Sequence, residues 1–362
     1  MTFNASTSRE QSSAGALATA TLKVVGVPLP TSVAQRAKIR PTEKIDLFVP
    51  ERGRITARRA KNNSGTPLTV AWNTPNVFAY GRNFIQTAGL AAGDVVAFDR
   101  VEDGEISFHA IDPLRDPLYL NPLRDQFGHP IPPGWLAQAF TDRPDPEAFM
   151  KGGARTAEIL AVWTAASGLQ IEQANLVVDF GCGCGRVMNF LADMTTAKFV
   201  GCDLHGPAIN WCKNHLRMGQ FLRGTTQPPL PLGANSVDFL YAISVLTHLD
   251  EALQNAWLDE WRRIVRPGGL VVATFHGDDY VANHLANKSE YKAKIDDLWK
   301  ANAGIAFLDN DAWAHVFPDF YQTTYHTIDY VTRVWARYFE IVEIKRYGEF
   351  ANSQNVAIML KP

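Results

Sequence analysis

The stretch Leu176 to Val187, LVVDFGCGCGRV, changes abruptly from strand-forming residues to three glycines at alternate positions. The run LVVDF is almost continuously apolar, which is typical of a strand buried on both faces of a parallel sheet. Gly181, Gly183 and Gly185 permit positive φ angles and let a ligand approach the backbone where side chains would block it. The stretch therefore predicts a buried strand that turns sharply into a ligand-binding loop.

The composition is that of an ordinary globular chain of 362 residues, 46% hydrophobic and 20% charged, which allows one large domain or two smaller ones. The formal net charge of −2 argues against binding nucleic acid or an anionic membrane by bulk electrostatics. No stretch approaches the roughly 20 apolar residues of a membrane span. The N-terminus has no basic segment followed by an apolar core, so no secretory signal is expected.

All four cysteines lie in one short region, between Cys182 and Cys212, rather than spread along the chain as a disulfide framework would be. This clustering predicts a reducing, cytoplasmic location. Cys182 and Cys184 are separated by one residue, whereas paired zinc ligands are usually separated by two to four. We therefore expect no metal and interpret the cysteines as small space-filling residues.

The periodicity of the apolar residues predicts three parts of the chain. Residues 1–30 are rich in Ala, Ser and Thr and are expected to form a disordered tail. Residues 31–112 alternate short β-like runs with turn signals and predict a small β-rich accessory domain. After a proline-dense connection, β-rich and helical runs alternate, which predicts a mostly parallel sheet with crossover helices over 113–362.

A second residue supports the ligand-binding loop. In such sheets ligands bind beyond the carboxyl ends of the strands. Asp203 ends the next β-like run, FVGCD, 24 residues after Asp179, where these folds keep an acid for ribose hydroxyls. Loop and acid together predict a ligand that contains a nucleoside. Arg186 stands where a dinucleotide fingerprint has its third glycine, which argues against a nicotinamide cofactor.

Taken in order, these runs resemble the motifs of class I S-adenosylmethionine-dependent methyltransferases. The matching runs are VVDFGCGCGRV, VGCD, SVDFLYAISVLTHLDE and WLDEWRRIVRPGGLVVATF. Upstream, PPGWLAQAFTDRPDPEAFMKGG is similar to a segment of small-molecule members whose glycine loop also reads FGCGCGR. Downstream, YFEIVEIKRY and SQNVAIMLKP are similar to the antiparallel strand pair that closes the sheet. Nothing before about Pro113 is covered by the resemblance.

The resemblance implies an α/β fold: a Rossmann-like, doubly wound sheet of seven strands over 113–362. Within it, 113–170 would lead into the sheet and 279–325 would form a lid over the substrate. The β-rich domain before it is expected to mediate homo-oligomerisation or to shape the substrate site.

The resemblance also assigns residues to the cofactor, S-adenosyl-L-methionine. Asp179 would anchor the loop and the amino acid end of the cofactor, and Asp203 would take the ribose hydroxyls. A loop-bracing role for Asp179 stays open, as does plain core packing for Leu204 and Ile243. The implied cofactor residues are Asp179, Gly181, Cys182, Gly183, Gly185, Asp203, Leu204, Ile243 and Ser244.

Two histidines are candidate general bases. His248, in SVLTHL, would lie one turn beyond the fourth strand, where an imidazole can take a proton at neutral pH or hold the loop by hydrogen bonding. His276, in TFHGDD, follows the fifth strand, and a hydrogen bond to backbone is its alternative role. Aromatic and polar residues of the lead-in and lid segments are expected to meet the substrate, with a second core as the alternative. They are Phe149, Tyr280, Trp313, Tyr321, Tyr325 and His326.

These features predict an enzyme that transfers a methyl group from S-adenosylmethionine to an oxygen or nitrogen nucleophile of a small molecule, such as a natural product, by in-line displacement. A nucleic-acid methyltransferase is the rival, because Arg36 to Lys61 holds nine Lys or Arg against three Asp or Glu. However, the fourth strand is not followed by the Pro-Pro-aromatic step that grips a flipped base. A protein that binds the cofactor without transferring its methyl group is the third alternative.

Overall fold

The computed structural model describes residues 18–21, 26–28, 36–38, 45–51, 54–59, 77–79, 95–102, 105–141, 145–308, 321–350 and 353–362. The chain divides after Pro146 into two compact units. The proline-dense connection that follows residue 113 lies in the first unit. Its helix α4 (Gly134–Gln138) contacts β1 (Ala18–Thr21).

The first unit contains a five-stranded antiparallel sheet in the order β1-β6-β7-β4-β3, as the β-rich prediction required. Its other strands are β3 (Ile45–Glu51), β4 (Arg54–Arg59), β6 (Val95–Glu102) and β7 (Glu105–Ala110). A second pair joins β2 (Gly26–Pro28) to β5 (Val77–Ala79), and a one-turn helix, α3 (Pro117–Leu120), lies in the connection. A disordered tail over 1–30 is wrong at β1 and β2, where pairing with other strands supplies the order that composition alone does not predict.

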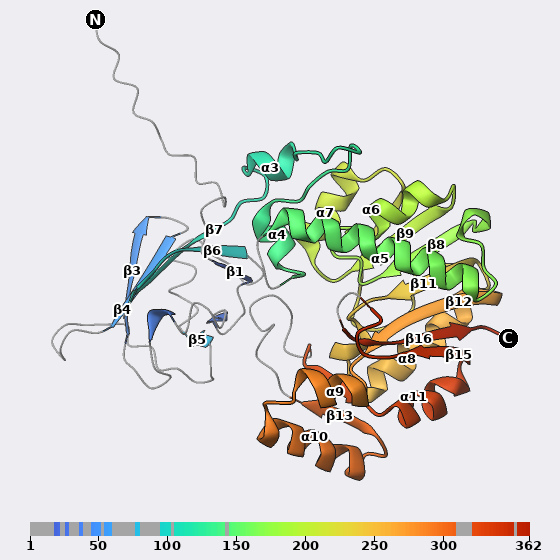
Figure 1. The fold of residues 1–362 in the computed structure, drawn as a ribbon. Coiled ribbons are helices and arrows are strands. Elements are labelled where there is room, and N and C mark those ends of the chain that lie inside the picture. Colours follow the sequence, from blue (N-terminus) through green and yellow to red (C-terminus); the bar gives the residue numbers. More distant parts are fainter. Residues whose placement is uncertain are drawn as a thin grey trace, which may run out of the picture. The chain divides into compact units, whose positions relative to one another are not determined.

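The second unit is built on a seven-stranded sheet in the order β10-β9-β8-β11-β12-β16-β15 (Figure 1). Its first five strands are parallel, and β16 inserts antiparallel between β12 and β15. This arrangement confirms the predicted Rossmann-like sheet with an antiparallel C-terminal pair. The strands are β8 (Leu176–Phe180), β9 (Lys198–Asp203), β10 (Gly219–Arg223), β11 (Val237–Ala242), β12 (Val265–Phe275), β15 (Glu340–Lys345) and β16 (Asn355–Leu360).

Helices cover both faces of this sheet (Figure 1). On one face α8 packs Trp257 and Trp261 edge-on against Phe180 of β8, with ring centroids 4.6 and 5.2 Å apart. The aromatic contacts bury large apolar area and hold α8 across the sheet. The helices are α5 (Pro146–Ala166), α6 (Met188–Leu191), α7 (Gly206–His215), α8 (Glu251–Ile264) and α11 (Ile328–Val334).

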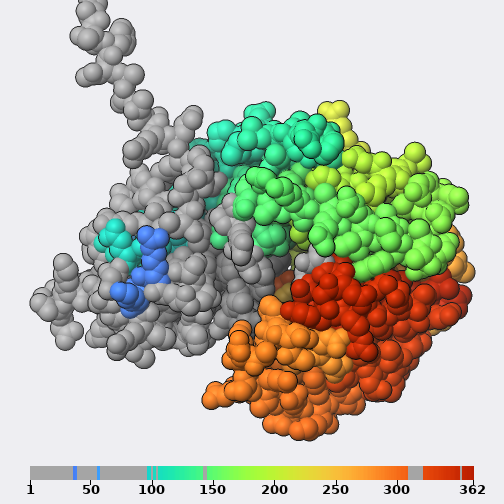
Figure 2. Space-filling view, viewed as in Figure 1, coloured from blue at the N-terminus to red at the C-terminus, as the bar shows by residue number. Residues whose placement is uncertain are grey.

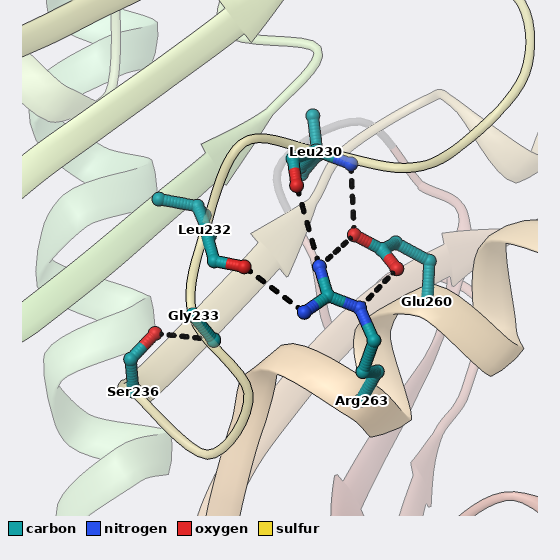
Figure 3. A network of polar contacts seen from close by, with 6 residues as sticks. All are labelled: Leu230, Leu232, Gly233, Ser236, Glu260 and Arg263. Carbon is teal, nitrogen blue, oxygen red and sulfur yellow. Dashed lines mark hydrogen bonds and ion pairs between the residues drawn. The ribbon is translucent and has the colours of Figure 1, made fainter.

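A polar network fixes the irregular segment that leads into β11 (Figure 3). Glu260 of α8 accepts the Leu230 amide at 2.8 Å and pairs with Arg263 at 2.6 Å. Arg263 also donates to the carbonyls of Leu230 and Leu232, at 3.3 and 3.0 Å. Backbone groups outside regular structure thus find partners on the helix, which positions the start of β11.

An accessory layer follows β12, in the segment predicted as a lid. It consists of α9 (Asp278–His284), α10 (Ser289–Ala301) and an antiparallel pair, β13 (Ile305–Leu308) with β14 (Thr323–His326). Its own small core holds Val281, Leu285, Ile295, Ala306 and Tyr325. In the space-filling view the layer (orange) lies beside the C-terminal residues (red), and Arg346 pairs with Asp279 at 3.1 Å (Figure 2). None of the described helices is long and apolar enough to cross a membrane.

Candidate active site

The parallel strands of the second unit end at one edge of the sheet, and most of the predicted site residues lie there. Strands β8, β9, β11 and β12 end at Phe180, Asp203, Ala242 and Phe275. Because the strands run parallel, the loops that follow them meet on this edge. We divide it into a glycine edge, formed by the ends of β8 and β9 with residues 181–186, and a histidine edge, formed by the ends of β11 and β12 with His248 and His276.

The glycine loop needs its glycines for backbone reasons. Gly181, Gly183 and Gly185 have φ angles of +84°, +54° and +77°, in the left-handed region that L side chains rarely adopt. A Cβ on Gly181 would overlap the Val245 side chain, and one on Gly185 would overlap Leu216. Turns continue through residue 187, so the helix after the loop, α6, begins later and is shorter than the sequence pattern predicts.

Asp203 is tied to the loop but keeps capacity for a ligand. One carboxylate oxygen accepts the Gly183 amide and the other accepts the His205 amide, both at 2.8 Å. Burial raises the pKa of Asp203, against these hydrogen bonds. The Leu204 backbone also lowers the pKa of this carboxyl by hydrogen bonding. The side chain is partly exposed, and a carboxylate has about four acceptor positions, so capacity for a ligand remains. Leu204, the next residue, is also partly exposed.

Asp179 lies at the end of β8 and has a partner that sequence reasoning missed. The Tyr241 hydroxyl, on the adjacent strand β11, donates to its carboxylate at 2.8 Å. Burial raises the pKa of Asp179 to about 7, while the Tyr241 hydrogen bond and the Arg186 charge act in the opposite direction. This bond ties Asp179 to β11 and not to the glycine loop, so a loop-bracing role for Asp179 stays a prediction. One feature of the sequence could have predicted this contact. Tyr241 lies within a buried strand, and a buried phenol needs a hydrogen-bond partner.

The cysteines at the glycine edge are packed and protonated. The Sγ atoms of Cys182 and Cys212 both lie 3.5 Å from the Gly183 carbonyl oxygen. Burial raises the thiol pKa of Cys182, Cys184 and Cys202, so none is a thiolate at neutral pH. Among the described residues, no three His, Cys, Asp or Glu side chains are placed to hold a metal ion. The Cys182 backbone N–H donates to the Cys202 carbonyl at 3.0 Å, and the Cys182 carbonyl accepts the Gly185 amide at 2.8 Å.

His248 lies at the histidine edge with one ring nitrogen committed and the other open. Its Nδ1–H donates to the Gln322 carbonyl at 2.8 Å, and its ring stacks on Tyr321 at a centroid distance of 3.9 Å. Because a carbonyl only accepts, the proton is on Nδ1 and Nε2 carries a lone pair. Nε2 makes no hydrogen bond within the described part of the chain. Burial lowers the pKa of His248 to about 4, so the ring is neutral at pH 7.

His276 differs from His248 because both of its ring nitrogens are used. Nδ1–H donates to the Thr324 carbonyl and Nε2 accepts the Gln354 amide, each at 3.2 Å. Gln354 in turn accepts the Ser244 hydroxyl at 3.1 Å. Burial, and then the neighbouring His248, lower the pKa of His276 well below its ordinary value. The backbone-bonded role is therefore the one seen, and no lone pair is left for a proton from substrate.

Ser244 and Ile243 follow β11 and are partly exposed, as the resemblance implied. Ser244 adopts a φ of +57°, and its backbone N–H donates to Thr274 Oγ1 at 2.7 Å. The strained residue is thus held by Thr274 of β12 and by Gln354 before β16. No sequence motif predicts either partner. Thr274 on β12 and Gln354, just before β16, reach this edge only in the folded sheet.

The predicted substrate residues separate into three groups. Tyr280 stacks on His276 at 4.2 Å and Tyr321 stacks on His248, so both lie at the histidine edge. Tyr325 is buried in the core of the accessory layer, its hydroxyl directed to Tyr291 at 3.5 Å. Trp313 lies outside the described residues.

His326 and Phe149 are buried, and a substrate role for either stays a prediction. Successive residues of a strand face opposite sides, so His326 points away from Tyr325 and is fully buried, with Nε2 2.9 Å from Gln254 Oε1. Phe149, on α5, is 2% exposed and lies under the Arg186 guanidinium. Both side chains are occupied by packing.

The donor set at the glycine edge fits the implied cofactor. Its three glycines carry no side chains, although their N–H groups donate to Cys202 O, Asp203 Oδ2 and Cys182 O. Asp203 is partly exposed, and Asp179 is a second, buried acid. Burial and then the Asp203 charge raise the pKa of Tyr321.

Part of the second unit matches a known protein family. A family model described as a methyltransferase domain matches residues 178–273, from β8 into β12. Among solved structures, a SAM-dependent methyltransferase from Methanosarcina mazei is 18% identical, with a TM-score of 0.40, and the match covers 52% of this chain and 93% of that one.

Two further structures are similar to the same extent. The 1,6-didemethyltoxoflavin-N1-methyltransferase of Burkholderia thailandensis is 15% identical, with a TM-score of 0.41 over 59% of this chain and 79% of that one. The magnesium protoporphyrin IX methyltransferase of Synechocystis is 14% identical, with a TM-score of 0.42 over 60% and 87%. The family match and the strand order agree: residues 178–273 match a methyltransferase domain, and they lie on the Rossmann-like sheet of the second unit.

Proposed function

We propose that this enzyme methylates an oxygen or nitrogen nucleophile of a small molecule, with His248 as the group that takes the proton. The observation that carries the proposal is the open Nε2 lone pair of a neutral, oriented imidazole at the edge where the cofactor binds. A general base needs a free lone pair on the unprotonated ring at the working pH. His248 has one, whereas Nε2 of His276 already accepts the Gln354 amide.

The proposed cofactor contacts follow the geometry of the glycine edge. Asp203 takes the ribose hydroxyls and Asp179 faces the ammonium of the amino acid end, while Gly181, Gly183 and Gly185 provide close backbone approach. Cys182 contributes backbone only, Leu204 packs on the adenine, and Ile243 and Ser244 line the side toward the sulfur. The bound cofactor supplies a methyl group that its positive sulfur has already activated.

Because the methyl group is already activated, the protein's task is alignment and proton removal. Tyr321 holds the His248 ring by stacking, and the Gln322 carbonyl holds Nδ1–H. When Nε2 takes the proton of the nucleophile, the resulting imidazolium keeps its hydrogen bond to Gln322 O, and that bond becomes charge-assisted and stronger. The residues of the glycine edge therefore hold the methyl donor, and His248 takes the proton.

A compact acceptor is supported by what surrounds His248 and His276. Tyr280 and Tyr321 stack on the two imidazoles, and aromatic faces of this kind favour a small, flat or apolar acceptor. The sequence after β11 lacks the Pro-Pro-aromatic step of enzymes that methylate a flipped base. The basic stretch from Arg36 to Lys61 is the only argument for nucleic acid, and no predicted cofactor residue lies in it.

A transfer assay with methyl-labelled S-adenosylmethionine tests the proposal. The full chain is incubated with a panel of small phenols, carboxylic acids and amines, and in parallel with duplex DNA and RNA. We expect label in a small molecule, abolished in Asp203→Ala. Label that enters only nucleic acid would favour the rival function. Cofactor binding by calorimetry without transfer to any acceptor class would favour the non-catalytic alternative.

A further inference from the structure

The imidazoles of His248 and His276 are held in the same way, although they follow different strands. Each ring donates Nδ1–H to a backbone carbonyl of one short segment, His248 to Gln322 at 2.8 Å and His276 to Thr324 at 3.2 Å. The two carbonyls belong to residues two positions apart, and two residues of extended chain span about 7 Å. The ring centroids are 6.5 Å apart, so the spacing of the two histidines follows the rise of this segment.

The surroundings of the two rings are also alike. Tyr321 stacks on His248 at a centroid distance of 3.9 Å, and Tyr280 stacks on His276 at 4.2 Å. Each histidine is 6% exposed, and burial lowers the pKa of both, so both rings are neutral at pH 7. A neutral ring that donates through Nδ1 carries its lone pair on Nε2. In tautomer, charge and stacking, His276 therefore equals His248.

Gln354 distinguishes the two rings. Because the Thr324 carbonyl only accepts, Nδ1 of His276 carries the proton and Nε2 accepts the Gln354 amide at 3.2 Å. The amide oxygen of Gln354 accepts the Ser244 hydroxyl at 3.1 Å, which keeps the N–H side of the amide directed at His276. Within the described part of the chain, no such donor reaches Nε2 of His248.

We propose that His276 is a latent second base, and that Gln354 determines the specificity of the site by covering it. Two uncovered bases with ring centroids 6.5 Å apart would offer two positions for the nucleophile. One acceptor could then bind in two orientations and be methylated at either of two groups. Gln354 leaves a single position, at His248. It acts through His276 and is therefore a positioning residue. The inference rests on the proposed role of His248.

The step at an uncovered His276 is the one proposed for His248. A lone pair of the nucleophile forms the new bond to the methyl carbon, and the methyl–sulfur pair stays on sulfur. The O–H or N–H pair stays on the nucleophile while its proton passes to Nε2 of the imidazole. The imidazolium keeps its Nδ1–H bond to the Thr324 carbonyl and later returns the extra proton to water.

NMR of the imidazole nitrogens in the ligand-free protein tests the covering without relying on turnover. Gln354→Ala removes the amide and admits water to Nε2 of His276, so the pKa of His276 should rise toward the ordinary 6.5. Gln354→Met is the matched control. It also removes the amide and releases Ser244, but its side chain keeps Nε2 covered, so the pKa of His276 should rise less. A His276 signal that Gln354→Ala leaves unchanged would contradict the inference.

Turnover in the absence of His248 tests the latent base. His248→Gln should lower kcat by roughly 10²- to 10⁴-fold. Adding Gln354→Ala should recover about tenfold or more, because the nucleophile can then reach Nε2 of His276. Adding Gln354→Met should recover nothing, and adding His276→Gln to the alanine double variant should abolish its gain. With an acceptor that carries two nucleophilic groups, Gln354→Ala alone should give two monomethylated products where the wild type gives one.

The outcomes separate this inference from the function on which it rests. A wild-type rate in His248→Gln would contradict the proposed base, and the NMR comparison would then decide the covering by Gln354. If His248→Gln is slow and its combination with Gln354→Ala is no faster, the latent base is overturned while the role of His248 stands. A merely structural Gln354 would slow turnover further in both double variants. Gln354→Ser serves if thermal denaturation shows that the alanine variant does not fold.

Discussion

The glycine edge and the histidine edge adjoin each other on one sheet, yet they are assembled differently. At the glycine edge the key contact joins residues 20 positions apart, Gly183 and Asp203. At the histidine edge the contacts span far more chain: 74 positions from His248 to Gln322, 78 from His276 to Gln354 and 110 from Ser244 to Gln354. The first edge is mostly built from one strand, a turn and the next strand, although Asp179 is bound by Tyr241, 62 positions away. The second exists only when the accessory layer and the C-terminal pair have folded onto the sheet.

The difference teaches why two similar histidines have different roles. Both rings are neutral and both donate Nδ1–H to a carbonyl of the segment that enters or forms β14. The two rings differ because Gln354, just before the last strand, donates a hydrogen bond to Nε2 of His276. Nε2 of His248 has no such partner in the described part of the chain. The free lone pair at the histidine edge is therefore decided by a long-range partner, whereas the glycine edge is shaped by backbone conformation.

Replacing the open histidine should have the largest effect. His248→Gln removes the proposed base, so kcat should fall by roughly 10²- to 10⁴-fold, the usual contribution of a positioned base. Cofactor affinity, measured by calorimetry, should stay within about twofold. His276→Gln is the matched control, since it removes an imidazole without a free lone pair, and its kcat should fall less than about tenfold. Equal losses in the two variants would remove His248 from the proton-transfer role.

A pair of glycine substitutions tests whether the glycine edge depends on backbone approach. Gly181 and Gly168 have nearly equal φ angles, +84° and +88°, but only Gly181 faces a close neighbour, Val245. Gly168→Ala should cost the left-handed strain alone, roughly 1–2 kcal/mol of unfolding free energy. Gly181→Ala should cost roughly 1–3 kcal/mol more from overlap. Urea denaturation measures both values, and equal losses would mean that the loop can move aside.

Replacing Asp203, the acid at the end of β9, should weaken cofactor binding. Asp203→Ala is expected to weaken S-adenosylmethionine binding by about 1.5–3 kcal/mol, the range for hydrogen bonds to a charged group. Asp297→Ala on α10 is the control, because that aspartate is exposed and far along the chain from the loop. Calorimetry that gives an unchanged affinity for Asp203→Ala would remove this residue from the cofactor site.

The neutral state of His248 should make stability depend on pH. Its folded pKa of about 4 is below the ordinary 6.5, so the unfolded chain binds more protons between these values. Stability contributed by the neutral ring is therefore present above pH 6.5 and is lost as the pH falls toward 4. Between pH 7 and 5, His248→Gln should reduce the acid loss of unfolding free energy by about 1–2 kcal/mol. Urea titrations at the two pH values measure this, and an unchanged loss would indicate that the folded ring is solvated.

The amino-acid sequence by itself determined the sheet, the glycine loop and Asp203. Strand and helix periods, glycines at positive φ and an acid at a strand end are local patterns, so the residues that carry them lie close together in the chain. Local patterns also leave two facts unpredicted. Alternation on a short strand placed His326 in the core, and pairing with β6 ordered part of the predicted tail. Composition alone contains neither fact.

Only the tertiary structure decided the environment of the titratable groups. Tyr241 binds Asp179 and Gln354 binds His276, and no sequence pattern predicts either contact. The pKa and the free lone pair of a side chain depend on burial and on partners tens of residues away. A sequence pattern can therefore predict where a histidine or an arginine lies along the fold. Which of its nitrogens remains free for a ligand is set by the packing of distant segments against it.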